Sequence, residues 1–331
     1  MKVIFVVGPT ASGKSQLALS LVLSLAEKSQ AAIFNCDSIQ SYQGLNIGSA
    51  KPSPQELEKV PHFLFDHVPL GQLFTAGQYQ REFFFQLEAV KNQFQVVFVV
   101  GGTGFYFQAI EKGMYSIGAA DPETILKVET EILQAGGPEK LFQELQARDP
   151  ETALKISLND HYRLARAIEM MRTHQKPVSE IKKEFNENAA SFPHPLLKLG
   201  LQLSKEELFP RVEARADLML KTGLLEEVRR LREMGLGSWA PMQSVGYREC
   251  QQFLDGEIRD LSALREKVIQ ATMKLAKKQR TWFRRDLQIH WLGPKDLGEA
   301  QKLTPVLSQF LKLEQCILKH FRLHAPISPI D

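Results

Sequence analysis

The sequence predicts an α/β protein: a P-loop core with a parallel sheet flanked by helices, plus an all-helical insertion domain. Short β-branched apolar runs alternate with amphipathic segments over the first hundred residues, a pattern typical of parallel sheets. A glycine-rich loop follows the first of these runs. Strand signals then stop between about residues 114 and 195, where only helical periodicity remains.

Three strands and two helices are expected in the first hundred residues. The apolar runs at residues 2–7, 31–34 and 96–100 predict the strands. Apolar side chains recur at helical spacing over residues 15–28 and 79–91, which predicts the helices. Because the strands are apolar throughout, both faces of the sheet must be covered.

The inserted region is expected to be helical because its segments are polar and amphipathic. Three such segments follow one another, at residues 121–134, 140–147 and 160–173. They lack the alternating or continuous apolar runs of strands. The predicted insertion domain therefore spans residues 114–195.

The chain then returns to the sheet. Residues 197–203 predict a strand, residues 205–285 are mostly helical, and residues 287–292 are expected to form a last strand. The predicted core thus comprises residues 1–113 and 196–331.

Composition excludes several classes of protein. The 331 residues are 44% hydrophobic and 24% charged, which is typical of a globular chain rather than a disordered one. Only five consecutive apolar residues precede Gly8, fewer than a signal peptide or a membrane span needs. The cytoplasm is therefore the expected compartment, with no membrane partner.

Cysteine and charge counts narrow the choice of metal and partner. Cys36, Cys250 and Cys316 are odd in number and widely spaced, so neither a disulfide framework nor a paired-cysteine zinc site is predicted. His62 and His67 also lack zinc-site spacing. Any metal is expected to bind oxygen. The formal charge of +3 does not establish a nucleic-acid partner, because a small total can hide a basic face.

The strongest functional signal lies between the first strand and the first helix. It matches the P-loop pattern G-x-x-x-x-G-K-[ST], with the residues Gly8, Pro9, Thr10, Ala11, Ser12, Gly13, Lys14 and Ser15. Glycines let the backbone wrap around an anion, Lys14 adds a positive charge, and the Ser15 hydroxyl can ligate Mg²⁺. The pattern predicts a site for a diphosphate or triphosphate.

The third strand lacks the acidic residue that P-loop hydrolases use to hold their metal. It runs directly into Gly101-Gly102-Thr103-Gly104. Routine ATP hydrolysis is therefore not expected.

A series of further motifs resembles the tRNA dimethylallyltransferase family. In chain order they are Asn35-Cys-Asp-Ser-Ile-Gln-Ser-Tyr42, residues 44–52, Pro61-His62, Asp66, residues 99–104, Asp149-Pro150, Asn159-Asp160, Arg163, Arg166, Glu169, Gly246-Tyr247-Arg248 and Thr281-Trp282. The resemblance covers nearly the whole chain. Cys36, Phe63 and residues 277–280 depart from the usual family pattern, and none is a proposed catalytic group.

The resemblance implies a transfer of the dimethylallyl group from dimethylallyl diphosphate to N6 of the adenosine 3′-adjacent to the anticodon in tRNA. Diphosphate leaves, Mg²⁺ assists, and no ATP is consumed. The P-loop would hold the leaving diphosphate, Ser15 its metal, and Arg215 part of its charge. From residues alone, Arg211 and Arg215 also fit a solvated helix face.

Two further catalytic roles are implied by the resemblance. Asp37 follows the carboxyl end of a predicted strand, where α/β active sites lie, and would act as general base toward N6. Thr103 would place its hydroxyl near the bridging oxygen of the leaving group. Without the resemblance, Asp37 is equally well explained as a turn or cap residue, and Thr103 as a turn residue.

Basic and aromatic residues predict an RNA-binding surface. Residues 274–285 contain six basic and no acidic residues, interleaved with Trp282 and Phe283. The resemblance implies that the insertion grips the tRNA anticodon stem-loop. The residues of this basic segment predicted to face RNA are Lys278, Gln279, Arg280, Trp282 and Arg284. The resemblance adds Asp37, Ser38, Ile39, Gln40, Tyr162, Arg163, Leu164, Ala165, Arg166, Ser244, Val245, Gly246, Tyr247 and Arg248.

Two alternatives remain open at this stage. A small-molecule kinase of the nucleotide type also carries a P-loop on a short chain, and it would consume ATP. A non-catalytic RNA-binding module would retain RNA affinity without turnover, although RNA binding alone needs no phosphate loop. The aromatic clusters at residues 83–85 and 105–107 are assigned to the core. A monomer is expected.

Overall fold

A computed structural model describes residues 1–331 except 26–29, 115–120, 189–190 and 294–331. The chain forms two compact units. One combines Met1–Glu111 with Phe192–Asp331, and the other is Lys112–Ser191. Cys316 and the last part of the predicted core lie outside the described residues.

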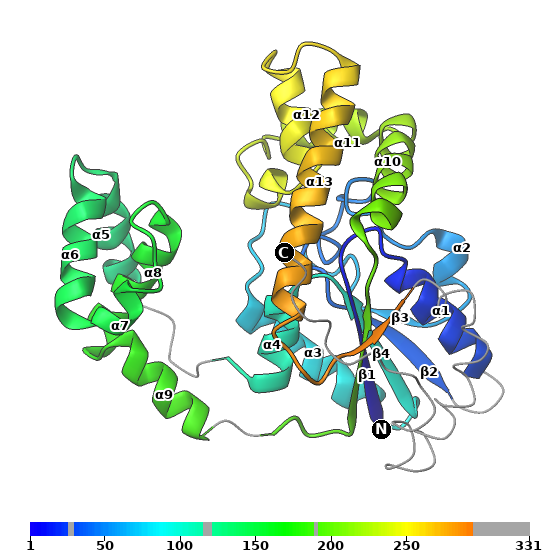
Figure 1. The fold of residues 1–331 in the computed structure, drawn as a ribbon, viewed down its shortest axis with the longest axis horizontal. Helices are drawn as coiled ribbons and strands as arrows, with labels where there is room; N and C mark the ends of the chain where they lie inside the picture. Colours follow the sequence, from blue (N-terminus) through cyan, green and yellow to red (C-terminus); the bar gives the residue numbers. More distant parts are fainter. Residues whose placement is uncertain (26–29, 115–120, 189–190, 294–331) are drawn as a thin grey trace. The chain divides into compact units, whose positions relative to one another are not determined.

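The first unit contains a six-stranded sheet in which every neighbouring pair of strands is parallel (Figure 1). Its order is β3-β2-β4-β1-β5-β6. The strands are β1 (Lys2–Val7), β2 (Ala31–Asn35), β3 (His62–Phe63), β4 (Val96–Gly101), β5 (Leu196–Leu201) and β6 (His290–Leu292). This confirms the predicted parallel α/β core. The sequence missed β3, because two residues are too few to form a pattern.

Helices cover both faces of this sheet, because successive side chains of each strand point to opposite faces. Ile4 and Val6 of β1 share a core with Leu21 of α1 (Lys14–Leu25). Phe5 points the other way, and its ring centroid lies 4.9 Å from that of Phe107 in α4 (Gly104–Lys112). On β2, Phe34 meets Phe83 of α3 (Ala76–Val90) at 5.8 Å. Of the aromatic clusters assigned to the core, Phe83 and Phe107 are buried, whereas Phe85 is 69% and Phe105 is 48% exposed, which corrects the prediction for those two.

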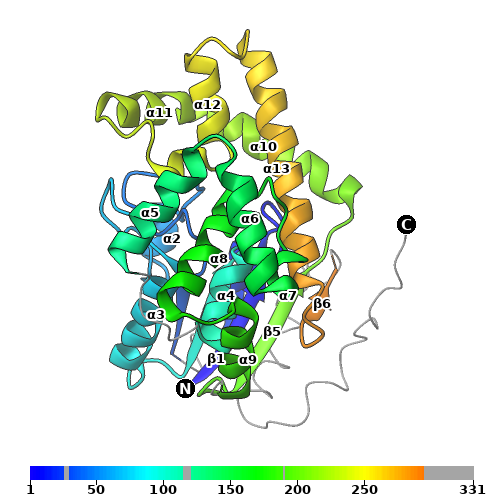
Figure 2. The ribbon, with the colours of Figure 1, turned by 90° about the vertical axis from the view of Figure 1, so that its left-hand side faces the viewer.

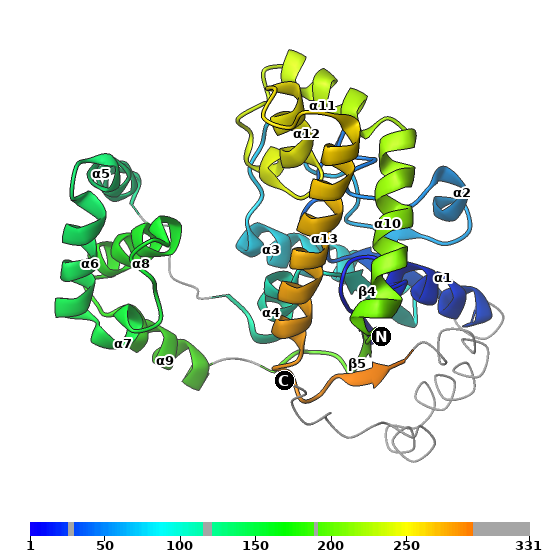
Figure 3. The same ribbon diagram turned by 45° about the horizontal axis from the view of Figure 1, so that its top comes forward.

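The rest of the first unit is mostly helical, as the sequence predicts for residues 205–285. It contains α10 (Lys205–Lys221), α11 (Leu224–Glu233), the 3₁₀-helix η1 (Ala240–Gln243), α12 (Tyr247–Leu254) and α13 (Leu261–Phe283), with the short α2 (Pro54–Leu57) earlier in the chain. Figure 3 shows α13 beside α10. Helices α10 to α13 and η1 share a second core with Tyr42 and Leu45 from the loop after β2.

The second unit consists of helices in its described part (Figure 2). They are α5 (Pro122–Leu133), α6 (Gly137–Arg148), α7 (Pro150–Ala153), α8 (His161–His174) and α9 (Val178–Asn188). Leu145, Leu164 and Ile168 lie in its apolar core. The Arg172 guanidinium of α8 donates to Glu131 of α5 and to Glu144 of α6, at 2.8 and 2.5 Å. This bidentate network holds three helices together.

Candidate active site

The glycine-rich loop, residues 8–15, leaves the carboxyl end of β1 and enters α1. Gly13 has φ 95°, a left-handed value that suits glycine, and Ala11 has φ 62°. The Ser12 Oγ is buried, and no described residue bonds to it. A buried polar atom without a partner is costly unless a ligand or water satisfies it. The loop therefore has the shape and the free polar atom of an anion-binding site.

Three cationic side chains lie at this loop, namely Lys14, Arg211 and Arg215. The Lys14 Nζ donates to the Pro9 carbonyl at 3.3 Å, and the Arg211 Nη1 of α10 donates to the Ser12 carbonyl at 3.2 Å. Burial lowers the pKa of Lys14 to about 8; the charge of Asp37 opposes this change and that of Arg215 adds to it. Burial also lowers the pKa of Arg215, again opposed by Asp37. The bond from Arg211 to the loop and the burial of Arg215 favour a role at the loop over a solvated helix face.

Asp37 lies two residues after the end of β2, in a turn that Asn35 organises. The Asn35 Oδ1 accepts from the Asp37 N–H at 2.9 Å, and its Nδ2 donates to the Asp37 carbonyl at 3.0 Å. The Asp37 Oδ1 accepts from the Ile39 N–H at 3.0 Å. No described residue donates to the other oxygen, Oδ2. The carboxylate thus has the turn role considered from the sequence and keeps one oxygen free for a substrate.

Thr103 lies directly beside the Asp37 turn. Its Oγ1 accepts from the Ser38 N–H at 3.0 Å and donates to the Ser38 Oγ at 3.4 Å. The turn after β4 reaches this position because Gly101 has no side chain: a Cβ there would lie 1.9 Å from the Cys36 carbonyl oxygen. The structure therefore brings two predicted catalytic residues together.

Helix α13 closes the site from another direction. The Gln279 Oε1 accepts from the Thr10 N–H at 2.7 Å, and its Nε2 donates to the Gly102 carbonyl at 3.1 Å. Trp282 packs so closely on the same turn that a Cβ at Gly104 would lie 2.1 Å from its Cδ1. The sequence assigned Gln279 to RNA, whereas both ends of its amide are occupied inside the protein.

Several other predicted RNA-facing residues are exposed. Lys278 of α13 and Arg284, directly after its last residue, lie at the surface, Arg280 is half-buried, and Trp282 is 38% exposed. On α8, Tyr162 is 81% exposed. Also on α8, Arg163 pairs with Asp160 at 3.4 Å, Arg166 pairs with Glu169 at 2.8 Å, and Ala165 is half-buried. Just before α12, Ser244 and Val245 are half-buried, and Arg248 in its first turn is exposed.

Two of the predicted RNA-facing side chains are buried, which corrects the prediction. Leu164 is 0% exposed because it belongs to the apolar core of the helical unit. Tyr247 is 0% exposed, and its hydroxyl donates to Glu227 at 2.6 Å. Gln40 is partly committed as well, since its Nε2 donates to the carbonyls of Ser49 and Ala50, both at 3.0 Å. Motif position does not reveal which way a side chain points.

Sequence reasoning missed Glu227, which holds the loop after β2 against α11. Its carboxylate is buried and accepts from the backbone N–H groups of Asn46, Ile47 and Gly48, in addition to the Tyr247 hydroxyl. The available signal was an acidic residue on the apolar stripe of a helix, between Leu224 and Leu231. Buried carboxylates need such partners.

Replacing Glu227 with glutamine is expected to lower the free energy of unfolding by about 1–3 kcal/mol, because an amide turned toward three N–H groups leaves buried donors unpaired. Thermal or urea unfolding measures this change. Glu226→Gln on the same helix is the control, since the Glu226 side chain is 66% exposed. Equal stability of the two variants would contradict a structural role for Glu227.

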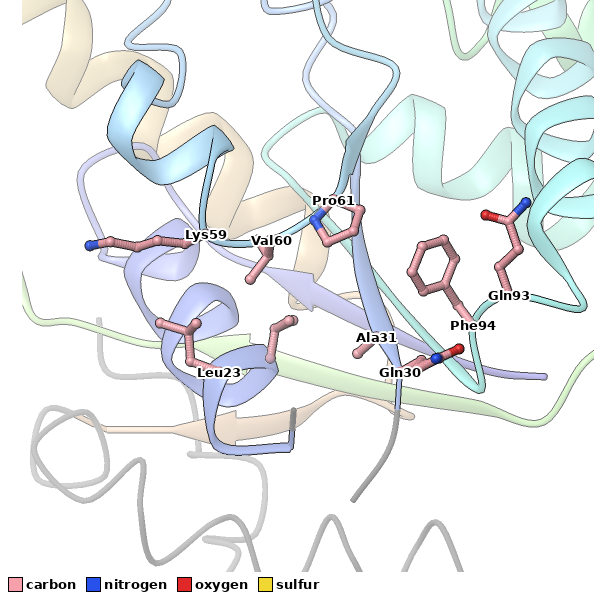
Figure 4. A pocket seen from close by; sticks show the side chains of 9 residues that line it. Leu23, Gln30, Ala31, Lys59, Val60, Pro61, Gln93 and Phe94 are labelled. Carbon is pink, nitrogen blue, oxygen red and sulfur yellow. The ribbon is translucent and has the colours of Figure 1, made fainter. Parts of the chain in front are cut away.

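Two cavities differ in what lines them. A small one of about 50 Å³ lies beside the glycine-rich loop, between Thr10, Arg215, Gly246 and apolar side chains that include Met219. A larger one of about 510 Å³ lies at the amino-terminal end of β2, near Lys59 and Phe94 (Figure 4). The carboxyl ends of the strands, with Asp37 and the loop, are at the opposite edge of the sheet. The larger cavity contains none of the predicted site residues.

Two features are absent from the described part of the chain. Within those ranges no helix is long and apolar enough to cross a membrane. Nor do any three histidine, cysteine, aspartate or glutamate side chains gather there in a group that could hold a metal.

The fold and the loop together define an α/β protein with the sequence pattern and the strand–loop–helix setting of a P-loop. The family model described as IPP transferase matches residues 40–286. The chain belongs to this family.

Named relatives and solved structures agree with this assignment. The chain is similar to a tRNA dimethylallyltransferase of Bdellovibrio bacteriovorus, with 47% identity over 94% of this chain and 98% of the relative. It is also similar to the tRNA dimethylallyltransferase of Cytophaga hutchinsonii, with 36% identity over 94% of this chain and 97% of that relative. A crystal structure of the tRNA isopentenylpyrophosphate transferase from Bacillus halodurans matches with TM-score 0.68 and 26% identity. The match covers 97% of this chain and 99% of that chain. The structure of a eukaryotic dimethylallyltransferase acting on tRNA matches with TM-score 0.80 and 26% identity. The match covers 94% of this chain and 79% of that chain.

Proposed function

We propose that the chain transfers a dimethylallyl group from dimethylallyl diphosphate to N6 of the adenosine 3′-adjacent to the anticodon in tRNA, with release of diphosphate. The observation that carries the proposal is the convergence of Lys14, Arg215 and Asp37 at the carboxyl edge of the sheet, close enough to act on one another's charge. Two cationic groups beside one carboxylate suit a reaction with an anionic leaving group and a proton to remove. The names of the relatives support the substrates.

The leaving diphosphate would be bound by the glycine-rich loop. Its backbone N–H groups, Lys14 and Arg215 provide positive charge where negative charge grows as the allylic carbon–oxygen bond breaks. Because these groups are fixed before the reaction, they need little reorganisation when the charge develops. Thr103 would turn its hydroxyl hydrogen from the Ser38 Oγ toward the bridging oxygen.

Asp37 would orient and deprotonate the amine. N6 is a poor nucleophile because its lone pair is delocalised into the purine ring. A hydrogen bond from N6 to the Asp37 Oδ2 would raise its electron density and fix its direction toward the allylic carbon. The Oδ1 bond to the Ile39 N–H holds the carboxylate in place meanwhile.

The residues at the loop fit Mg²⁺ as a cofactor. The ion prefers oxygen, keeps several waters, and is commonly bound through a substrate phosphate with few protein ligands. Ser15 offers an exposed hydroxyl at the start of α1 for this purpose. When bound, the ion would neutralise part of the diphosphate charge.

The RNA would contact the basic face of α13 and the helical unit. Lys278, Arg280 and Trp282 of α13, with Arg284 directly after it, provide charge and a stacking surface. Tyr162 and Arg163 provide the same chemistry on α8, where the helical unit would grip the anticodon stem-loop. The target base must leave its stack, so contacts with the RNA must offset the unstacking cost. We place this activity in the cytoplasm, in a monomer.

Lys278→Glu is expected to weaken tRNA binding about tenfold, because Lys278 is exposed on the basic face of α13. The slope of log affinity against log salt concentration should decrease by about one, the equivalent of one phosphate contact. The apparent KM for dimethylallyl diphosphate should stay within about twofold of the unaltered value. A salt-series filter-binding assay measures the first effect. Lys267→Glu, an exposed lysine of the same helix outside the basic segment, is the control. Unchanged tRNA affinity in Lys278→Glu would remove this face from the interface.

Diphosphate affinity is expected to fall as the pH rises through about 8, because the pKa of Lys14 in the free protein is lowered to about 8 by burial. Below that pH the ammonium is charged and binds the anion. Above it, binding requires uptake of a proton. Titration calorimetry with inorganic diphosphate and Mg²⁺ between pH 7 and about 9.5 measures the effect. Lys14→Gln should lack this step and retain only the titration of diphosphate itself.

The proposed reaction is tested with purified protein, Mg²⁺, unmodified tRNA and labelled dimethylallyl diphosphate in the absence of ATP. Label in the RNA is expected, with release of one diphosphate per adenosine modified. ATP consumption with a small-molecule acceptor would instead support a kinase. Binding of tRNA without turnover on any prenyl donor would support an RNA-binding module.

A further inference from the structure

Gln279 occupies an unusual position on α13. The side chains of this helix that are buried against the rest of the unit include Thr272, Ala276 and Phe283. Gln279 continues the same stripe, at steps of four, three and four residues, which places it on the inward face of the helix. Its neighbour Lys278 points to solvent. The stripe is therefore interrupted by a polar side chain at one inward turn.

That turn is where α13 passes two loops of the active site. The Gln279 Oε1 accepts from the Thr10 N–H of the glycine-rich loop at 2.7 Å. Its Nε2 donates to the Gly102 carbonyl at 3.1 Å, one residue before Thr103. A single amide thus joins two segments that are 177 and 269 residues away from it in the sequence. Both bonds satisfy backbone groups that are buried at this point.

The surrounding backbone leaves this amide little freedom. A Cβ at Gly102 would lie 2.3 Å from the Gln279 Nε2, so a side chain there would displace the amide from its present position. One helical turn further on, Trp282 restricts Gly104 in the same way. The Gln279 amide thus spans the gap between the two loops and bonds to both.

We infer that Gln279 is a positioning residue for the leaving diphosphate, and that it does not contact RNA. The inference rests on the proposed function, because it takes the glycine-rich loop as the diphosphate site and Thr103 as a donor to the bridging oxygen. By fixing Thr10 relative to Gly102, Gln279 keeps the loop N–H groups and the Thr103 hydroxyl at one spacing before any ligand binds. Without Gln279, the loop would have to become ordered when diphosphate binds, and the cost of this ordering would weaken diphosphate binding.

Binding of inorganic diphosphate with Mg²⁺ tests this, with and without unmodified tRNA, in the full chain. Gln279→Met preserves the length of the side chain and removes both hydrogen bonds. We expect diphosphate affinity to fall about tenfold, as the loss of two neutral hydrogen bonds implies, and tRNA affinity to stay within about twofold. Lys278→Met, one residue away and exposed, should show the opposite pattern.

Gln279→Glu gives a second reading. Its carboxylate can still accept from the Thr10 N–H but repels the Gly102 carbonyl and the diphosphate, so the loss of diphosphate affinity should exceed that of Gln279→Met. If Gln279→Met does not fold, Gln279→Glu still tests whether Gln279 positions the diphosphate site. Unaltered diphosphate affinity in either folded variant, or a parallel loss of diphosphate and tRNA affinity, would overturn the inference. If the unaltered protein binds no diphosphate in either condition, the proposed function itself fails.

Discussion

Asp37→Asn is expected to lower the rate of prenyl transfer by about 10²- to 10⁴-fold, the range typical of a lost general base. An amide cannot take the proton from N6. It can still accept from the Ile39 N–H through its own oxygen, so the turn after β2 should keep its shape. Single-turnover transfer with saturating tRNA and dimethylallyl diphosphate measures the chemical step directly.

Asp37→Ala separates the two roles of this carboxylate. It should lose transfer to a similar extent, retain tRNA binding, and in addition lose about 1 kcal/mol of stability, because the turn loses the acceptor for its Ile39 N–H. Thermal unfolding of the two variants distinguishes them. Transfer at nearly the original rate in Asp37→Asn would mean that the carboxylate acts only in the turn.

Arg215→Gln is expected to slow transfer by about 10²-fold, or roughly 3 kcal/mol in the activation free energy, because one fixed charge beside the leaving diphosphate is lost. Arg215 lines the small cavity with Thr10 and lies within electrostatic range of Asp37 and Lys14. Both kcat and kcat/KM should fall, since the charge matters most as the bond breaks.

Arg211→Gln is the matched control for Arg215. Both arginines belong to α10, four residues apart, but the Arg211 Nη1 already donates to the Ser12 carbonyl. Its loss should affect the loop conformation more than the leaving group, with a change of about tenfold or less. A larger effect at Arg211 than at Arg215 would reverse the assignment of the two side chains.

Much of this architecture could be predicted because its signals are local. The apolar runs of β1, β2 and β4 and the pattern at residues 8–15 each occupy a few consecutive residues, so periodicity and spacing reveal them. The roles proposed for Asp37, Thr103 and Arg215 came instead from the family resemblance. The structure adds that all three lie at the carboxyl edge of one sheet.

The rest depended on contacts between distant residues. Tyr247 lies in a motif that the resemblance assigns to RNA, yet its hydroxyl bonds to Glu227, twenty residues away. Gln279 was assigned to RNA because it lies within a basic segment, and nothing nearby reveals its bond to Thr10. Glu227 on α11 and Gln279 on α13 are each a polar side chain on the inward face of a helix. Such a residue is a signal that sequence reasoning can use.

The strand order has a consequence for biosynthesis. β1 emerges first and yet needs β5, which follows the whole helical unit, as its second neighbour. The Thr10 contact with α13 must wait for a further eighty residues or so after β5. Such long-range pairings form slowly and leave unpaired strand edges exposed in the meantime. A ribosome-bound chain therefore displays the complete glycine-rich motif long before it has a site, and competence for catalysis arrives only when translation has passed α13.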